Sequence, residues 1–172
     1  MLAIRKLFVP FGHETCAKPR HIDTVVVHTM HHPEFSGDDR FKLENLVSIL
    51  ERHNVAAHYI ILRDGEVIQI VADEDVARHT GESAMPNNSD SGKVNAFSLG
   101  IELASAKDTA PTDAQYDALS RLIIQKITDG VPIRHIVGHD EIALPKGRKD
   151  DPWNFDWQRL RKSLAAHGFR ER

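Results

Sequence analysis

Short apolar runs at two places in the chain predict buried strands that each deliver a histidine. Positions 23–28 are mostly β-branched and end at His28, and positions 133–139 form a second apolar run that ends at His139. Short continuous apolar runs bounded by turn residues are typical of strands buried in a sheet. We therefore predict strands over 23–28 and 133–139, with a histidine at the end of each.

A hairpin and a half-polar strand are predicted between these two runs. The β-type runs 55–62 and 66–71 are separated by three residues that include Asp64 and Gly65, and Asp-Gly between apolar runs favours a hairpin. At 97–104, large apolar residues alternate with small residues and Glu102. This period of two predicts a strand with one bulky face, and a second face whose small residues leave room for a substrate over Glu102.

Three helices are predicted from apolar residues spaced three and four positions apart. The first carries its stripe between Leu43 and Leu50, with Asp38 or Asp39 near its start. The second follows a capping box at 111–115, and the third is capped by Asp156 and closed at position 168.

The order of these elements predicts the fold class. Strands alternate with helices, so we predict an α/β fold with a single mixed β-sheet flanked by helices. The 172 residues suit one domain over 1–172. Residues 1–20 contain Pro10, Gly12 and Pro19 with little periodicity, which predicts an irregular N-terminal arm.

Composition and charge exclude several classes of partner. The formal net charge is -3 without a long run of one sign, which argues against a nucleic-acid-binding protein. No apolar run approaches the ~20 residues that span a bilayer, and the first residues do not resemble a signal peptide. We therefore expect no membrane partner, a cytoplasmic location and a monomer, with export as a phage endolysin or a secreted effector as the alternative.

Chemistry-bearing residues fall on three of the predicted strands. His28, Glu102 and His139 are far apart in sequence and can lie side by side in one sheet. Two histidines and a carboxylate or thiolate, with an open fourth position, commonly hold a catalytic zinc ion. The carboxylates that could complete such a set are Asp140, Glu141, Asp150 and Asp151. Spacing alone leaves both the zinc and the choice of carboxylate open.

Seven segments in a fixed order make the prediction more specific. They are 25–28, 57–66, 78–81, 95–102, 113–116, 138–139 and 148–152. Together they resemble the zinc-dependent N-acetylmuramoyl-L-alanine amidases, a family that includes AmpD-type anhydro-muropeptide amidases and the animal peptidoglycan recognition proteins. The resemblance covers roughly positions 23–160 and implies the fold of that family.

The resemblance implies a metal site and two catalytic residues. The positions of the zinc ligands are occupied by His28, His139 and Asp151. Asp150 stays an alternative to Asp151, because residues 144–147 look like a lengthened loop. Glu102 matches the family's acidic catalytic residue, and Lys149 matches its catalytic lysine.

The resemblance also implies contacts with substrate. Arg148 resembles an arginine that contacts a carboxylate of the stem peptide, and we expect His79 and Asn95 to bind substrate as well. Two positions depart from the family: Ala57 stands where some relatives have a tyrosine, and Arg78 replaces an aromatic residue.

The implied reaction is hydrolysis of the lactyl amide between N-acetylmuramic acid and L-alanine in peptidoglycan or muropeptides. Whether the sugar is the 1,6-anhydro form is left open. The alternative is a recognition module that binds muropeptides without cutting them. Such relatives typically lack a zinc ligand, whereas this chain keeps all three and the lysine, which favours the enzyme.

Overall fold

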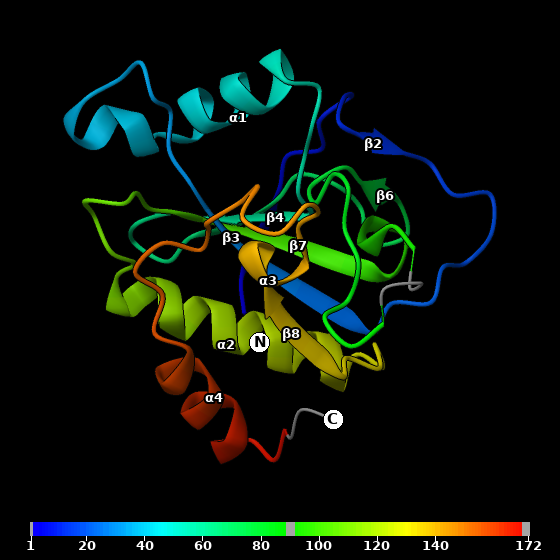
Figure 1. Ribbon diagram of the computed structural model, residues 1–172. Coiled ribbons are helices and arrows are strands. Elements are labelled where there is room, and N and C mark those ends of the chain that lie inside the picture. Colours follow the sequence, from blue (N-terminus) through cyan, green and yellow to red (C-terminus); the bar gives the residue numbers. More distant parts are fainter. Residues whose placement is uncertain (1, 89–91, 170–172) are drawn as a thin grey trace.

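The centre of the molecule is a six-stranded mixed sheet in the order β1-β5-β4-β7-β3-β8. The computed structural model describes residues 2–88 and 92–169 (Figure 1). The strands are β1 (Ile4–Lys6), β3 (Thr24–Met30), β4 (Tyr59–Ile61), β5 (Val67–Gln69), β7 (Ser98–Ala104) and β8 (His135–Gly138). β4, β7, β3 and β8 are parallel, β5 is antiparallel to β4, and β1 is parallel to β5. The predicted fold class is confirmed.

Helices cover both faces of this sheet. Figure 1 shows α1 (Leu43–Arg52) on one side, and α2 (Asp113–Thr128) with α4 (Trp157–Ala166) on the other. The short α3 (His139–Ile142) follows β8, and a small second sheet pairs β2 (His13–Glu14) with β6 (Val76–Ala77). Two 3-10 helices, η1 (Gly37–Phe41) and η2 (Val94–Phe97), complete the elements. Within the described residues, no helix is long and apolar enough to cross a membrane.

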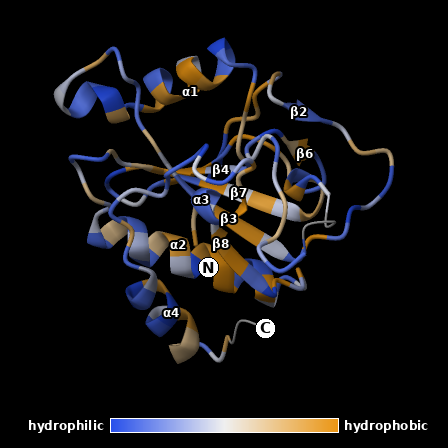
Figure 2. Cartoon of the chain, viewed as in Figure 1, coloured by the Kyte–Doolittle hydropathy of each residue, from blue (hydrophilic) through white to orange (hydrophobic). Residues whose placement is uncertain are grey.

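The alternation of side chains along the strands distributes the apolar core over both faces of the sheet, in three clusters. Tyr59 and Ile61 pack with α2 and α4, whereas Ile60 between them packs with α1. Figure 2 shows hydrophobic residues concentrated in the central strands and a mixture of hydrophilic and hydrophobic residues along the helices. The face of β3 and β7 that turns away from α2 and α4 is therefore available for polar residues.

Two predicted helix starts are confirmed and one is wrong. Thr112 and Gln115 form the predicted capping box of α2, and the Asp156 side chain caps α4. Asp38 and Asp39 lie instead in the first turn of η1, and α1 begins only after Lys42. The segment breaks there because the backbone of Lys42 is extended, which ends the 3-10 turn before the α-helix starts.

The N-terminal segment is more regular than predicted. β1 adds to the edge of β5, and the pairing continues as Leu7 and Val9 donate backbone hydrogen bonds to the carbonyls of Gln69 and Ile70. Three residues such as Ile4–Lys6 are too few to show a period of two, so this strand had no signal in the sequence. The strand predicted to end at His139 also stops one residue earlier, because His139 opens α3.

Candidate active site

The sheet register brings the first two candidate residues together. β3 and β7 are adjacent and parallel, and His28 lies directly opposite Glu102. Their neighbours Val27 and Ile101 point into the core under α2, so His28 and Glu102 point to the opposite face. His139 follows β8, which pairs with the other side of β3. All three residues therefore meet at the carboxyl ends of parallel strands, where α/β sheets commonly place their sites.

Three donor atoms converge there and could hold a metal ion. Nδ1 of His28 lies 3.1 Å from Nδ1 of His139 and 3.2 Å from Oδ2 of Asp151, and the last pair, His139 Nδ1 and Asp151 Oδ2, is 3.3 Å apart. Zinc bonds of about 2.0–2.2 Å in a tetrahedron separate neighbouring ligand atoms by about 3.3–3.6 Å. The spacing of the three atoms is close to that of three corners of such a tetrahedron.

The charge states of these groups suit metal binding. Burial lowers the pKa of His28 to about 4, so its imidazole is neutral at neutral pH. Burial alone raises the pKa of Asp151, but its contacts with the imidazoles of His139 and His28 outweigh this and hold that pKa below its usual value. Neutral imidazoles and an ionised carboxylate are the forms that coordinate divalent metals.

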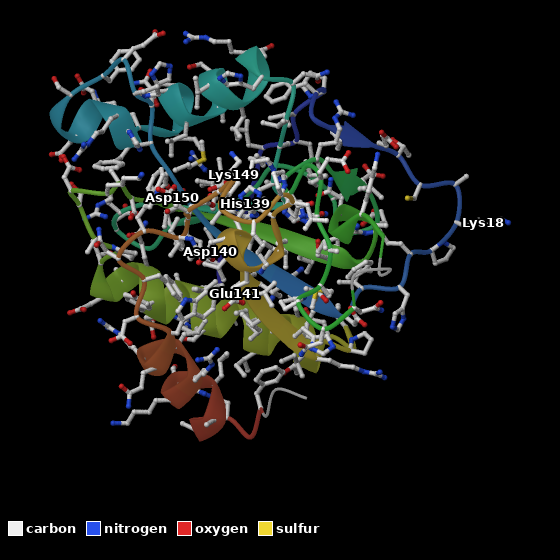
Figure 3. All side chains as sticks on the ribbon, in the orientation of Figure 1. Lys18, His139, Asp140, Glu141, Lys149 and Asp150 are labelled. Atoms are coloured by element: carbon white, nitrogen blue, oxygen red, sulfur yellow. The ribbon has the colours of Figure 1, made fainter. Side chains whose placement is uncertain are left out.

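The structure brings Asp151, and not Asp150, to the two histidines. The backbone oxygen of Asp151 accepts a hydrogen bond of 2.9 Å from Asp140 N, which closes the intervening loop. The Asp150 side chain is exposed; it pairs with Lys107 and accepts a 2.9 Å hydrogen bond from Trp153 Nε1. Figure 3 shows His139, Lys149 and Asp150 gathered where this loop passes over the sheet.

Glu102 is a buried carboxyl group beside the donor atoms. The residue is 9% exposed, and its Oε2 has no hydrogen-bond partner in the described part of the chain. Burial raises the pKa of Glu102 well above its usual value and the negative charge of Asp151 adds to this, whereas the positive charge of Lys149 lowers it. Lys149 lines the same cavity as Glu102.

The cavity over these residues has a volume of about 1060 Å³ and a lining of mixed character. Its lining includes four cations, Arg78, Lys93, Arg148 and Lys149. Apolar residues from β3, α1 and the segment after α1 also line it: Met30, Ile49, Leu50, Val55 and Ala56. A ligand with both anionic and apolar groups suits such a cavity.

The residues predicted to bind substrate line this cavity, but their polar atoms already have partners. Arg148 donates to the backbone oxygens of Leu144, Thr80 and Glu82 at 2.7–2.8 Å. Asn95 Oδ1 accepts hydrogen bonds from the 79–80 backbone. His79 lies against His28, with 2.9 Å between His79 Nδ1 and His28 Nε2.

The space expected for substrate beside Glu102 is partly filled by protein. A Cβ at Gly100 would lie only 2.6 Å from the ring of His79. The small face of β7 therefore accommodates a histidine ring at Gly100, whereas Glu102 still lines the open cavity. The sequence could not show this, because His79 reaches Gly100 from a loop that has no regular pattern.

Sequence reasoning missed Arg20, which lies in the segment predicted to be irregular. Its guanidinium donates to the backbone oxygens of Asp73, Asn95 and Ser98 at 2.6–2.9 Å and contacts Nε2 of the buried His58. Arg20 thus ties the N-terminal segment to the loops behind the site. A single arginine among turn residues carries no signal of such a role.

Comparison with known proteins gives the same family from sequence and structure. Residues 18–154 match the family model described as N-acetylmuramoyl-L-alanine amidase. The chain is 34% identical to the 1,6-anhydro-N-acetylmuramyl-L-alanine amidase AmpD of Haemophilus influenzae, over 85% of this chain and 84% of that protein. It is 36% identical to AmpD of Citrobacter freundii, over 68% of this chain and 61% of that protein.

Solved structures agree with this similarity. A crystal structure of an AmpD derivative has a TM-score of 0.73 and 30% identity, and the match covers 95% of this chain and 96% of that one. The E. coli amidase AmiD, solved in complex with anhydro-N-acetylmuramic acid-L-Ala-D-gamma-Glu-L-Lys, has a TM-score of 0.66 and 25% identity over 87% of this chain and 60% of that one. The chain belongs to the N-acetylmuramoyl-L-alanine amidase family.

Proposed function

We propose that this protein is a zinc-dependent N-acetylmuramoyl-L-alanine amidase that cleaves the lactyl amide of muropeptides. The observation that carries the proposal is the donor group of His28, His139 and Asp151 in a member of this family. Beside it lies a carboxyl oxygen of Glu102 that has no hydrogen-bond partner among the residues the structure describes. A cytoplasmic location and a monomeric state stay predictions from the sequence.

The proposed roles follow from the chemistry of each group. His28 Nδ1, His139 Nδ1 and an oxygen of Asp151 would hold the zinc ion. Zinc, when bound, supplies a water of lowered pKa and polarises the scissile carbonyl group. Glu102 would take the proton from the attacking water at Oε2 and return it to the alanine nitrogen as the carbon–nitrogen bond breaks.

Lys149 would face the oxygen of the scissile carbonyl. Its ammonium group lines the cavity close enough to lower the pKa of both His28 and Glu102. A fixed cation where negative charge develops stabilises the transition state of acyl transfer. The products are the free lactyl carboxylate on the sugar and a peptide that begins with L-alanine.

We propose a soluble 1,6-anhydro-muropeptide as the substrate. The relatives at 34–36% identity carry that activity in their names, and the related AmiD was solved with an anhydro-muropeptide. The cations in the cavity lining, which include Arg148 and Lys93, suit the carboxylates of a stem peptide.

Parallel digestion of soluble anhydro-muropeptides and intact sacculi tests this proposal. We expect the zinc-loaded protein to release free peptide from the soluble substrate, detected by mass spectrometry, with far less release from sacculi. Glu102→Gln should bind zinc and muropeptide but lose about 10²-fold or more in rate, because the proton carrier is gone. Binding of muropeptide without any cleavage would overturn the proposal in favour of a recognition module.

A further inference from the structure

We infer that two consecutive residues, His79 and Thr80, position the two histidines of the metal group, and that Asn95 holds this pair in place. We call these three residues the brace. The inference rests on the proposed function for the identity of the metal. It makes His79 and Asn95 positioning residues rather than substrate contacts.

Each metal-site histidine has its outer nitrogen against one residue of the pair. His139 Nε2 lies 3.1 Å from the backbone oxygen of Thr80. His28 Nε2 lies 2.9 Å from His79 Nδ1, and the two rings meet edge to face at 86°. One dipeptide therefore touches both histidines on the side away from the donor atoms.

The contact of His139 requires the tautomer in which Nδ1 is available to a metal, and the contacts of His28 accommodate the same tautomer. A carbonyl oxygen only accepts, so His139 carries its hydrogen on Nε2 and keeps the Nδ1 lone pair. His28 is in the same state when its Nε2–H donates to His79 Nδ1. The remaining hydrogen of His79, on Nε2, then faces Ser98 Oγ at 3.2 Å. Every ring hydrogen in this chain of contacts has an acceptor.

Asn95 fixes the dipeptide itself. Its Oδ1 accepts from the backbone N–H groups of His79 at 3.2 Å and Thr80 at 3.0 Å, and from Thr80 Oγ1 at 2.9 Å. Three donors on one oxygen of a buried side chain leave that oxygen no capacity for a ligand. Asn95 therefore influences the metal site by holding His79 and Thr80 in place.

Gly100 provides the space for the His79 ring. Its backbone is not in the left-handed region, so its conformation does not require glycine. A Cβ there would lie 2.6 Å from both Cγ and Nδ1 of His79, closer than side chains pack. The His79 ring therefore explains why position 100 is a glycine. A Gly100→Ala substitution would displace this ring but leave the imidazole group itself in place.

The brace should be worth a factor of ten to a hundred in metal affinity. Groups that hydrogen-bond the outer nitrogen of a ligand histidine typically contribute about 10–100-fold. The test is the zinc dissociation constant of purified variants, measured by competition with a chelator. We expect His79→Leu to weaken zinc binding by about 10–100-fold, and His79→Asn, which can keep an acceptor near Nδ1, to weaken it much less.

His32→Leu is the matched control for His79→Leu. His32 is more buried than the partly exposed His79, at 1% exposure, and it contacts Glu34 N and the ring of Phe35 rather than the metal group. It should lower stability without changing zinc affinity. If His79→Leu binds zinc as tightly as the parent protein, the brace is refuted while the proposed function stands. If the parent protein binds no zinc at all, the proposed function fails first.

Gly100→Ala keeps the test decisive should His79→Leu not fold. We expect Gly100→Ala to weaken zinc binding in the parent protein and to add little in a His79→Ala background, because the ring that it displaces is already absent. Equal effects in both backgrounds would refute a route through His79.

Kinetics separate positioning from substrate contact. At saturating zinc, His79→Asn should leave KM for the anhydro-muropeptide within about twofold of the parent value, because a residue that does not contact substrate does not contribute to substrate binding. A raised KM with an unchanged zinc dissociation constant would return His79 to the substrate-binding residues and overturn the inference.

Discussion

Asp150 and Asp151 are adjacent in the sequence, but only Asp151 lies beside the two histidines of the metal group. Asp151 lies with its oxygens 3.2–3.3 Å from the two histidines, whereas Asp150 turns outward to Lys107 and Trp153. The family resemblance favoured Asp151, but Asp150 stayed an alternative because the loop that separates them from His139 looked lengthened. The choice depends on a loop closed by one backbone hydrogen bond from Asp140 to Asp151.

The pair offers a matched experiment at the residue scale. Asp151→Asn should lose most zinc binding, because a neutral amide oxygen is a far weaker ligand than a carboxylate. Asp150→Asn should keep zinc and lose only an exposed ion pair with Lys107, which is worth little. Metal content of the two purified variants, measured by atomic absorption, checks this. The reverse result would move the ligand to Asp150.

At the scale of elements, the sequence predicts what depends on neighbours along the chain. The β-branched run of β3, the alternation of β7 and the capping box of α2 are local patterns, and all three elements form as expected. β1 and the contacts of His79 depend on residues that are distant in the sequence. β1 forms by pairing with β5, and the His79 ring occupies the space over Gly100. Neither could be predicted from a local pattern.

The capping box gives a prediction for stability alone. Thr112 Oγ1 accepts from Gln115 N at 3.1 Å and donates to the Arg63 carbonyl at 2.8 Å, so it joins the start of α2 to the turn after β4. Thr112→Ala should lower the free energy of unfolding by about 1 kcal/mol, up to about 2. Urea unfolding measures this, with Thr128→Ala at the exposed end of α2 as a control near zero. Zinc affinity should not change.

At the scale of the whole molecule, the buried titratable groups set the pH dependence of the metal-free fold. Burial lowers the pKa of His28 to about 4, of His58 to about 3, and of His79 well below its usual 6.5. Burial raises the pKa of Glu102 above its usual 4.5. Between pH 6.5 and 4.5 the unfolded chain therefore gains protons on three histidines, while the folded protein holds an extra proton on one carboxyl group.

The three histidines outweigh the one carboxyl group, so acid should destabilise the metal-free protein in this window. The unfolded chain binds more protons than the folded protein, and the free energy of unfolding falls as the pH falls, by up to about 1.4 kcal/mol per pH unit for each excess proton. Urea unfolding in the presence of a chelator, at steps between pH 7 and pH 5, measures this. Glu102→Gln should steepen the fall, because it removes the opposing contribution. Constant stability across the range would contradict the prediction.

The spacing of the donor group along the chain has a mechanical consequence. His28 and Asp151 are 123 positions apart, so a metal ion bound by both would close most of the chain into one ring. With a single cysteine, the chain cannot form an internal disulfide, and zinc would be its reversible cross-link. Zinc at a hundred times its dissociation constant should raise the free energy of unfolding by about 2.7 kcal/mol. Thermal melts and limited proteolysis with and without a chelator would measure it. Zinc availability would then decide how long the folded chain survives, as well as how fast it works.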